Sequence, residues 1–216
     1  MGTIFGDAAI ATGRHGSALL DMPDHRGTFS FRADQSGSEG PPREAYSRVT
    51  NPERFAPLHG YGAELLARLE REFEIESTEG YDLDPYLGTE KDVVRPIVML
   101  EPREPDAAPI TIAFSKFPGL SVRFGQWVTM GFPACGCDAC NERVEDEIER
   151  LRVRVDDLVA GRFWESIRIP DVGDTWREYG FGSRESGSMR LDRDEALHLL
   201  ENGPASYEWK PWRRRL

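Results

Sequence analysis

Phe132-Pro133-Ala134-Cys135-Gly136-Cys137-Asp138-Ala139-Cys140-Asn141 holds every cysteine of the 216-residue chain. Before this stretch, apolar residues alternate with polar ones in the manner of β-strands. After it, apolar residues recur with the period of an α-helix. We therefore expect the cysteines to lie at the junction between a sheet and a helix, and the remainder of the chain is interpreted outward from that junction.

The residues before the cysteines predict antiparallel strands. Ile110–Phe117 and Leu120–Phe124 each alternate like a half-buried strand, and Pro118-Gly119 between them favours a tight turn, so the pair is a predicted hairpin. Gln126–Met130 continues as a strand up to the cysteines. Val93–Leu100 is also apolar but contains Pro96, which predicts an edge strand or an interrupted one.

A long helix is predicted to begin near Glu142. Its apolar positions repeat at spacings of four and three, which places them on one helical face: Val144, Ile148, Leu151, Val155 and Leu158. Acidic residues crowd its first half and arginines follow, and we interpret these charges as a solvated face, not as paired catalytic carboxylates.

A second long helix is predicted upstream, with Thr50 or Asn51 as N-cap and Pro52 in the first helical position. Its apolar residues share one face and are expected to join the core: Phe55, Leu58, Gly62, Leu65, Leu66, Leu69 and Phe73. His59 beside this face is interpreted as a surface or capping histidine.

The region after the helix that begins near Glu142 is harder to assign. Ile169–Ser188 contains four glycines and is predicted to be rich in loops, whereas Asp192–Pro204 predicts a short capped helix with a Gly-Pro end. Trp209 and Trp212 are expected to pack onto the domain surface. These elements together predict an α+β fold, in which an antiparallel β-sheet carries two long helices and a short C-terminal helix.

The N-terminal residues differ in composition from the others. Residues 1–43 are rich in Gly, Ser, Asp and Pro and carry few apolar groups, so we expect a mostly disordered tail. His15 and His25 in that tail are interpreted as solvated. Residues 44–216 are expected to form a single α+β domain.

The net charge and the cysteine content restrict the expected binding partners and the expected cellular compartment. A formal net charge of −11 and a pI near 4.9 argue against binding to nucleic acid or to an anionic membrane and favour a basic protein partner. Three clustered cysteines do not make a disulfide framework, which favours a reducing compartment. Met1–Asp7 shows no basic region and no long apolar run, so the expected location is the cytoplasm.

The Cys-x-Cys-x-x-Cys cluster carries the chemistry. Cys135, Cys137 and Cys140 are candidate zinc ligands, because converging thiolates favour zinc and Gly136 lets the backbone bend between them. A structural zinc site takes four protein ligands. The fourth is expected to come from His198, His59, an acid such as Asp138 or Glu142, or a second subunit. The cluster is also compatible with reduced cysteines that shape a turn, and less readily with a redox pair formed by Cys137 and Cys140, because the βαβ pattern of thioredoxin-like proteins is absent.

Two stretches carry a resemblance to a known family. Tyr46–Phe55 (YSRVTNPERF) and Phe132–Cys140 (FPACGCDAC) resemble a family of bacterial proteins of unknown function, common in high-GC actinobacteria. The resemblance covers roughly residues 44–165. It implies no activity, cofactor or catalytic residues.

Three classes of function remain open on the sequence. The first is a non-enzymatic domain, stabilised by zinc, that binds a protein partner. The second is a thiol-disulfide redox protein. The third is an enzyme whose site is assembled from distant residues, because the sequence contains no Gly-x-Ser-x-Gly, His-Glu-x-x-His or phosphate-loop signature.

Overall fold

The computed structural model describes residues 40–201 and 203–216. The predicted disordered tail, residues 1–43, falls almost entirely outside these residues. Of the tail, residues 40–43 are described, and Arg43 begins a 3-10 helix, η1 (Arg43–Tyr46). No helix among the described residues has both the length and the apolar character needed to cross a membrane.

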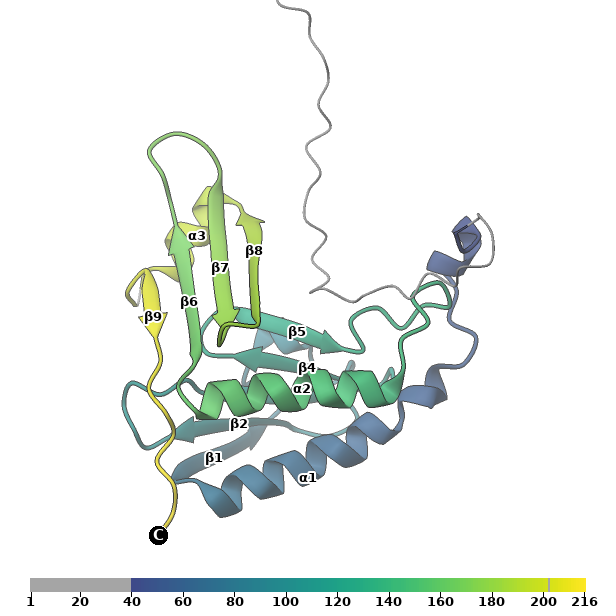
Figure 1. Cartoon of the computed structure of the whole chain (residues 1–216), viewed down its shortest axis with the longest axis horizontal. Helices are drawn as coiled ribbons and strands as arrows, with labels where there is room; N and C mark the ends of the chain where they lie inside the picture. Colours follow the sequence, from purple (N-terminus) through teal and green to yellow (C-terminus); the bar gives the residue numbers. More distant parts are fainter. Residues whose placement is uncertain (1–39, 202) are drawn as a thin grey trace, which may run out of the picture.

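Five antiparallel strands form a first sheet in which each strand pairs with the next one in the chain (Figure 1). They are β1 (Ile75–Gly80), β2 (Ile97–Pro102), β3 (Ile110–Ser115), β4 (Gly119–Phe124) and β5 (Val128–Phe132). The predicted hairpin is confirmed as β3 and β4, which pair from Ile110 with Phe124 to Ser115 with Gly119.

Of the two predictions for Val93–Leu100, the edge strand is wrong and the strand interrupted at Pro96 is confirmed, because Val93 forms only an isolated bridge with Ser115 before the strand proper. Strand β2 begins at Ile97, directly after Pro96, and pairs with both β1 and β3. Proline lacks the N–H that a central strand must donate, so pairing starts only beyond it. The edge is formed by β1, which the sequence analysis did not predict because four consecutive exposed residues, Glu76–Glu79, hide its alternation.

Two long helices were predicted to pack on the antiparallel sheet. Both are present, as α1 (Pro57–Glu72) and α2 (Val144–Val159). Their predicted apolar faces are buried in one core cluster with the sheet. Helix α1 approaches the sheet closely at Gly62, where an added Cβ would lie 3.0 Å from Leu120 and 3.1 Å from Phe114. The two helices are joined by an ion pair between Arg68 and Asp156 at 3.1 Å.

The start of α1 differs from the prediction. Pro52–Phe55 forms a separate 3-10 helix, η2, and the α-helix begins only at Pro57. Asn51 makes no side-chain capping bond, and the N–H of Thr50 is bound by a distant aspartate instead of by the helix. Two prolines, neither of which can donate an N–H, divide the predicted helix start into two short steps.

A second sheet contradicts the loop-rich interpretation of Ile169–Ser188. Four antiparallel strands lie in the order β8-β7-β6-β9. They are β6 (Phe163–Arg168), β7 (Thr175–Phe181), β8 (Glu185–Leu191) and β9 (Ser206–Glu208). Charged residues on the inner face, such as Glu165 and Arg177, interrupt the apolar alternation that would have revealed these strands. The predicted short helix is confirmed as α3 (Arg193–Leu199), capped by Asp192.

The two sheets share one core. Phe124 of the first sheet contacts Phe181 of the second at 5.2 Å between ring centroids, and Phe181 stacks on Phe163 at 4.7 Å. Trp209 and Trp212, expected on the surface, are 8% and 4% exposed. The observed structure is α+β, with antiparallel sheets and three α-helices, as predicted.

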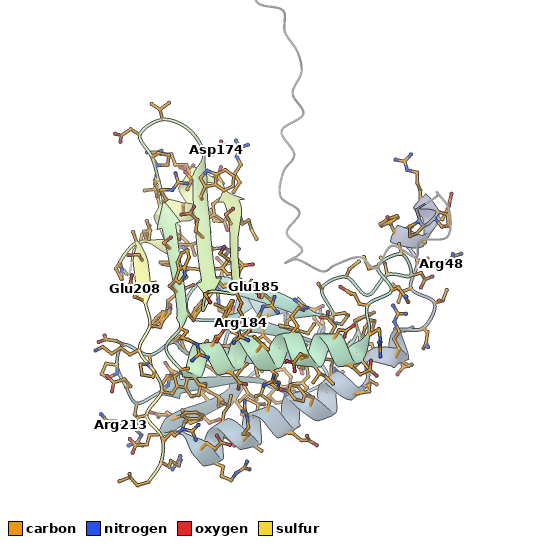
Figure 2. The ribbon with its side chains drawn as sticks, in the orientation of Figure 1. Arg48, Asp174, Arg184, Glu185, Glu208 and Arg213 are labelled. Atoms are coloured by element: carbon orange, nitrogen blue, oxygen red, sulfur yellow. The ribbon has the colours of Figure 1, made fainter. Side chains whose placement is uncertain are left out.

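The solvated-face interpretation of the α2 charges is wrong at Glu147 and Arg154, which are both buried. Asp157, on which no prediction was made, is buried as well. The hairpin between β7 and β8 lies over the helix, as Figure 2 shows at Arg184 and Glu185. Arg154 pairs with Glu185 at 2.5 Å, and Asp157 accepts from Arg162. Glu185 begins one strand of the second sheet and Arg162 directly precedes another, and because that sheet was not predicted, the burial of Arg154 and Asp157 was not predicted either.

Candidate metal centre

The cysteine loop connects β5 to α2 and lies at the end of the first sheet beside η1 (Figure 1). The backbone of the loop takes a positive φ of +77° at Gly136. A Cβ at this position would also lie 2.8 Å from the Phe117 ring. Glycine is therefore required here both for the backbone conformation and for the close approach of the ring.

The loop brings the three cysteines together, as predicted. One sulfur atom from each of Cys135, Cys137 and Cys140 lies within 4.8 Å of the other two, and all three thiols are free. Cys135 is exposed, Cys140 is half-buried and Cys137 is 3% exposed. Three soft sulfur ligands therefore converge on one small site, and Cys135 is the one that is accessible to solvent.

Neighbouring groups shift the ionisation of the two inner thiols in opposite directions. Burial opposes ionisation of Cys137, but hydrogen bonds to its sulfur from Cys135 and from the N–H groups of Cys140 and Ala139 outweigh burial and lower its pKa. Burial, followed by hydrogen bonds and charge from the other two cysteines, raises the pKa of Cys140 to about 12. Hydrogen bonds to the charged form are the cause that separates the two thiols.

Glu142 shapes the loop. One of its carboxylate oxygens, Oε2, accepts hydrogen bonds from the N–H groups of Cys135 at 3.1 Å and Gly136 at 2.8 Å. This contact closes the first turn of the loop and leaves the side chain directed at the backbone. Glu142, one of the predicted fourth ligands, thus stabilises the backbone of the cysteine loop in the structure.

The other predicted fourth ligands lie in contacts of their own. His59 Nε2 is 3.0 Å from the carbonyl oxygen of Gly119, and its ring meets Phe114 edge-on. His198 lies on α3 and its Nδ1 is 3.3 Å from Glu201. Asp138 binds Arg48 and Thr50. Among the described residues, the group of converging ligand atoms contains the three cysteine sulfurs and no histidine or carboxylate.

The cysteine loop also anchors the N-terminal segment, which we define as residues 43–55. The N–H groups of Asp138 and Ala139 donate to the carbonyl oxygens of Arg48 and Ala45 at 2.8 and 3.1 Å. Ala45 is buried in a small cluster with Cys137 and Ala139. The segment is therefore held to the body of the protein through the cysteine loop.

Arg54 extends this anchor. Its Nη2 donates to the carbonyl oxygen of Gly136 at 3.0 Å, and its guanidinium group lies 4.5 Å from the centroid of the Phe55 ring. Neither Ala45 nor Arg54 belongs to a motif that predicted this role. The available signal was that the two stretches that carry the family resemblance, Tyr46–Phe55 and Phe132–Cys140, are the two that the structure brings into contact.

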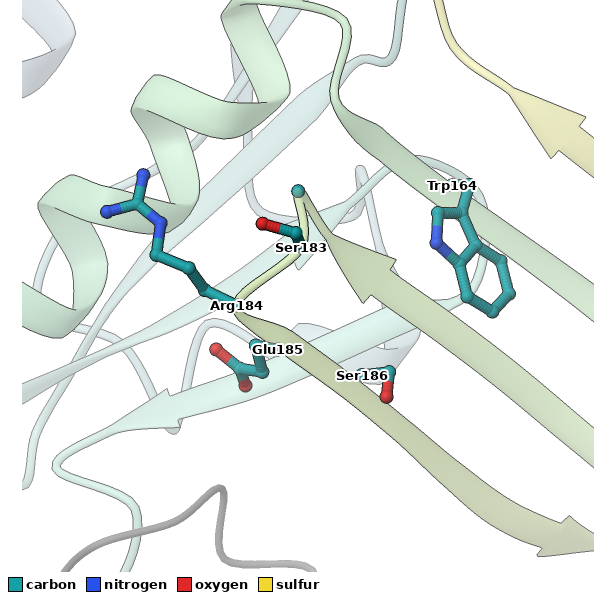
Figure 3. Close-up of a pocket in the computed structure, with 6 residues that line it drawn as sticks. Trp164, Ser183, Arg184, Glu185 and Ser186 are labelled. Carbon is teal, nitrogen blue, oxygen red and sulfur yellow. The ribbon is translucent and has the colours of Figure 1, made fainter.

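Away from the cysteine loop, a shallow pocket lies at the hairpin between β7 and β8 (Figure 3). It is lined by Trp164, Gly182, Ser183, Arg184, Glu185 and Ser186. The lining contains no histidine or cysteine, and Glu185 is paired with Arg154. This pocket therefore offers no general base and nucleophile pair of the kind that an acyl-transfer site requires.

Comparison with known proteins identifies the family. A family model matches residues 23–216. The chain belongs to DUF6226, a family of unknown function. The match confirms the expected membership of such a family and extends the shared region beyond residues 44–165 on both sides. No curated protein and no solved structure matches this DUF6226 chain.

Proposed function

We propose that Cys135, Cys137 and Cys140 bind a zinc ion and that the ion is a structural staple in a non-enzymatic domain. The observation that carries the proposal is the convergence of three sulfur atoms within 4.8 Å of one another from a loop of six residues. Thiolates at this spacing suit zinc, which accepts sulfur ligands in tetrahedral sites. The N–H groups of Ala139 and Cys140 that point at the Cys137 sulfur would stabilise a ligating thiolate.

The proposed staple has a defined structural consequence. The same loop that carries the three sulfurs binds the N-terminal segment through Ala45 and Arg48. An ion that joins Cys135, Cys137 and Cys140 would hold the loop in the conformation that those hydrogen bonds require. Removal of the ion should therefore loosen residues 43–55 before it affects the sheets.

The staple supports a surface for a protein partner. Tyr46 is 50% exposed and Val49 is 40% exposed, and both lie on the segment that the loop anchors. The net charge of −11 would steer a basic partner towards the protein. The proposal places the protein in the cytoplasm, where thiols remain reduced and available to zinc.

A thiol redox role is the alternative. It is favoured by the contact between Cys137 and Cys140 and by the opposite shifts of their pKa values. The thiol with the lowered pKa is, however, only 3% exposed. An attacking thiolate must reach its disulfide substrate, so the burial of Cys137 favours zinc over redox chemistry.

Elemental analysis of the full-length, untagged protein tests the proposal, with thiol titration before and after chelation. We expect one zinc per chain, thiols that react only after chelation, and loss of zinc in Cys135→Ser, Cys137→Ser and Cys140→Ser. Ala134→Ser is the matched control, because Ala134 is an exposed residue of the same loop, and it should keep the zinc.

Two results would contradict the proposal. A metal-free protein with three freely reactive thiols would exclude zinc. A metal-free protein that forms a reversible Cys137–Cys140 disulfide would establish the redox alternative.

A further inference from the structure

Strand β8 is an unprotected sheet edge. It is the outermost strand of the second sheet (Figure 1), and within residues 40–201 and 203–216 its backbone pairs only with β7. It is seven residues long. Ser186 and Arg190 are exposed, and Met189 is 38% exposed. A free edge of this length presents a row of unpaired N–H and C=O groups to solvent.

The other edges of the described sheets are protected. Strand β1 carries the exposed charges of Glu76 and Glu79. Along β5, the carbonyl oxygen of Gly131 accepts from Arg150 at 2.6 Å, and that of Trp127, next to the strand, accepts from Arg177 at 2.7 Å. Strand β9 has only three residues. Charges, occupied carbonyl groups and short length are the means by which proteins prevent edge-to-edge pairing.

Strand β8 has none of these protections in its central part. Ser186-Gly187-Ser188-Met189 contains no charge and no proline. A Cβ at Gly187 would lie 2.5 Å from the Tyr179 ring, so this ring covers Gly187 on one face of the sheet. On the other face, the Trp164 ring covers Gly180, which pairs with Ser186 of β8. Aromatic rings therefore cover glycine positions on both faces of the sheet next to this edge.

We propose that β8 pairs in antiparallel fashion with β8 of a second copy of this chain, around a twofold axis near Ser188. Charge favours this occupant. The strand carries one acid and one base, Glu185 and Arg190, so it is locally neutral in a chain of net charge −11. Two such chains repel each other over most of their surface but not along this strand.

The residues of β8 complement their own twofold image. Pairing around Ser188 places Arg190 opposite Ser186 of the partner subunit, and Met189 opposite Gly187 of the partner subunit. No like charges face each other, and Met189 lies opposite a glycine whose position is covered by the Tyr179 ring of the same subunit. Directly opposed residues in an antiparallel pair lie close enough for such contacts to determine whether the strands associate.

Sedimentation velocity of the full chain over a wide range of concentration tests the proposal. We expect a reversible monomer–dimer equilibrium. Ser188→Lys places two like charges opposite each other at the axis and should raise the dimer dissociation constant roughly tenfold or more. Ser206→Lys is the matched control, because Ser206 is an exposed serine of β9 at the other edge of the same sheet, and it should leave the dimer unchanged.

A charge exchange separates pairing from loss of folding. Ser188→Glu alone should also weaken the dimer, and a mixture of Ser188→Lys and Ser188→Glu should restore association as a mixed dimer. A full chain that is monomeric throughout would overturn the proposal, whatever occupies the edge instead. So would a dimer that Ser188→Lys does not weaken, or a mixture of the two variants that does not associate.

Discussion

Asp138 Oδ1 accepts hydrogen bonds from both the backbone N–H and the hydroxyl group of Thr50, at 2.9 and 3.1 Å. The two residues are 88 positions apart in the chain. Asp138 stands between Cys137 and Cys140, where an additional metal ligand would be expected. Its bonds to Thr50, and its ion pair with Arg48 at 3.0 Å, instead make it the clamp between the cysteine loop and the N-terminal segment.

Asp138→Ala is predicted to release the N-terminal segment without removing zinc. Loss of the carboxylate leaves the Thr50 N–H and hydroxyl without their partner, so residues 43–51 should open more often. Tryptic cleavage at Arg43 and Arg48 under native conditions should become several-fold faster, with zinc content unchanged. Glu145→Ala, at an exposed acid of the neighbouring helix, should not change the cleavage rate.

A fall in pH should have the same effect as that substitution. The N–H of Thr50, the largest cause, lowers the pKa of Asp138. A depressed pKa means that the contribution of this carboxylate to stability is present above its unfolded pKa and is lost as pH falls through the folded value. Hydrogen exchange of the Thr50 amide in the wild-type protein, corrected for its intrinsic pH dependence, should therefore accelerate below about pH 4. Equal acceleration in Asp138→Ala would show that another group is responsible.

His59 and His198 are predicted not to be zinc ligands. Each lies against another partner in the structure, so His59→Ala and His198→Ala should both retain one zinc per chain by elemental analysis. His59→Ala should lower the free energy of unfolding by about 1 kcal/mol, because it removes the bond to Gly119. Loss of zinc from either variant would identify that histidine as the fourth ligand.

Glu165 is predicted to make stability fall as pH rises. The side chain is 0% exposed and receives three hydrogen bonds, from the N–H groups of Gln126 and Trp127 and from the indole of Trp209. Burial nevertheless dominates and raises its pKa from 4.5 to about 7. The folded state therefore holds a proton that the unfolded state has released, and this contribution to stability is lost between pH 4.5 and about 7.

Comparison with Glu165→Gln isolates this effect. Glutamine does not ionise, so the difference in unfolding free energy between wild type and variant should shift by about 3 kcal/mol in favour of the variant as pH rises across that range. Urea denaturation at pH 5 and pH 8 measures the difference. A difference that stays constant with pH, or that shifts in favour of the wild type, would show that the three hydrogen bonds outweigh burial.

Gly125 and Gly173 form a matched pair that separates backbone conformation from packing. Both have positive φ, +61° and +106°. A Cβ at Gly125 would overlap Glu165 Oε1, whereas nothing lies within 4 Å of one at Gly173. Gly173→Ala should lower the free energy of unfolding by about 1 kcal/mol, which is the cost of the backbone conformation alone. Gly125→Ala should cost at least about 3 kcal/mol in the free energy of unfolding. Equal costs would show that the bend between β4 and β5 readily moves away from Glu165.

The residues that sequence reasoning missed share one property, which is that their contacts are made by distant parts of the chain. Glu165 has the pattern of an exposed strand residue, yet it is buried because the turn before β5 and Trp209 donate hydrogen bonds to it. Arg154 has the pattern of a solvated helix face until Glu185 is placed over it. Neither burial has a signal within a short window of sequence.

The sequence by itself determined the two long helices, the β3–β4 hairpin and the convergence of Cys135, Cys137 and Cys140. Each of these depends on residues that are close in the chain, where period, turn chemistry and spacing act directly. The tertiary structure alone decided that the second sheet buries charged residues, that Asp138 clamps Thr50 and that the side chains of His59, His198, Asp138 and Glu142 bind groups other than the cysteine sulfurs. Most of these features depend on contacts between residues far apart in the chain, and the balance between burial and pairing there is set only when the elements pack together.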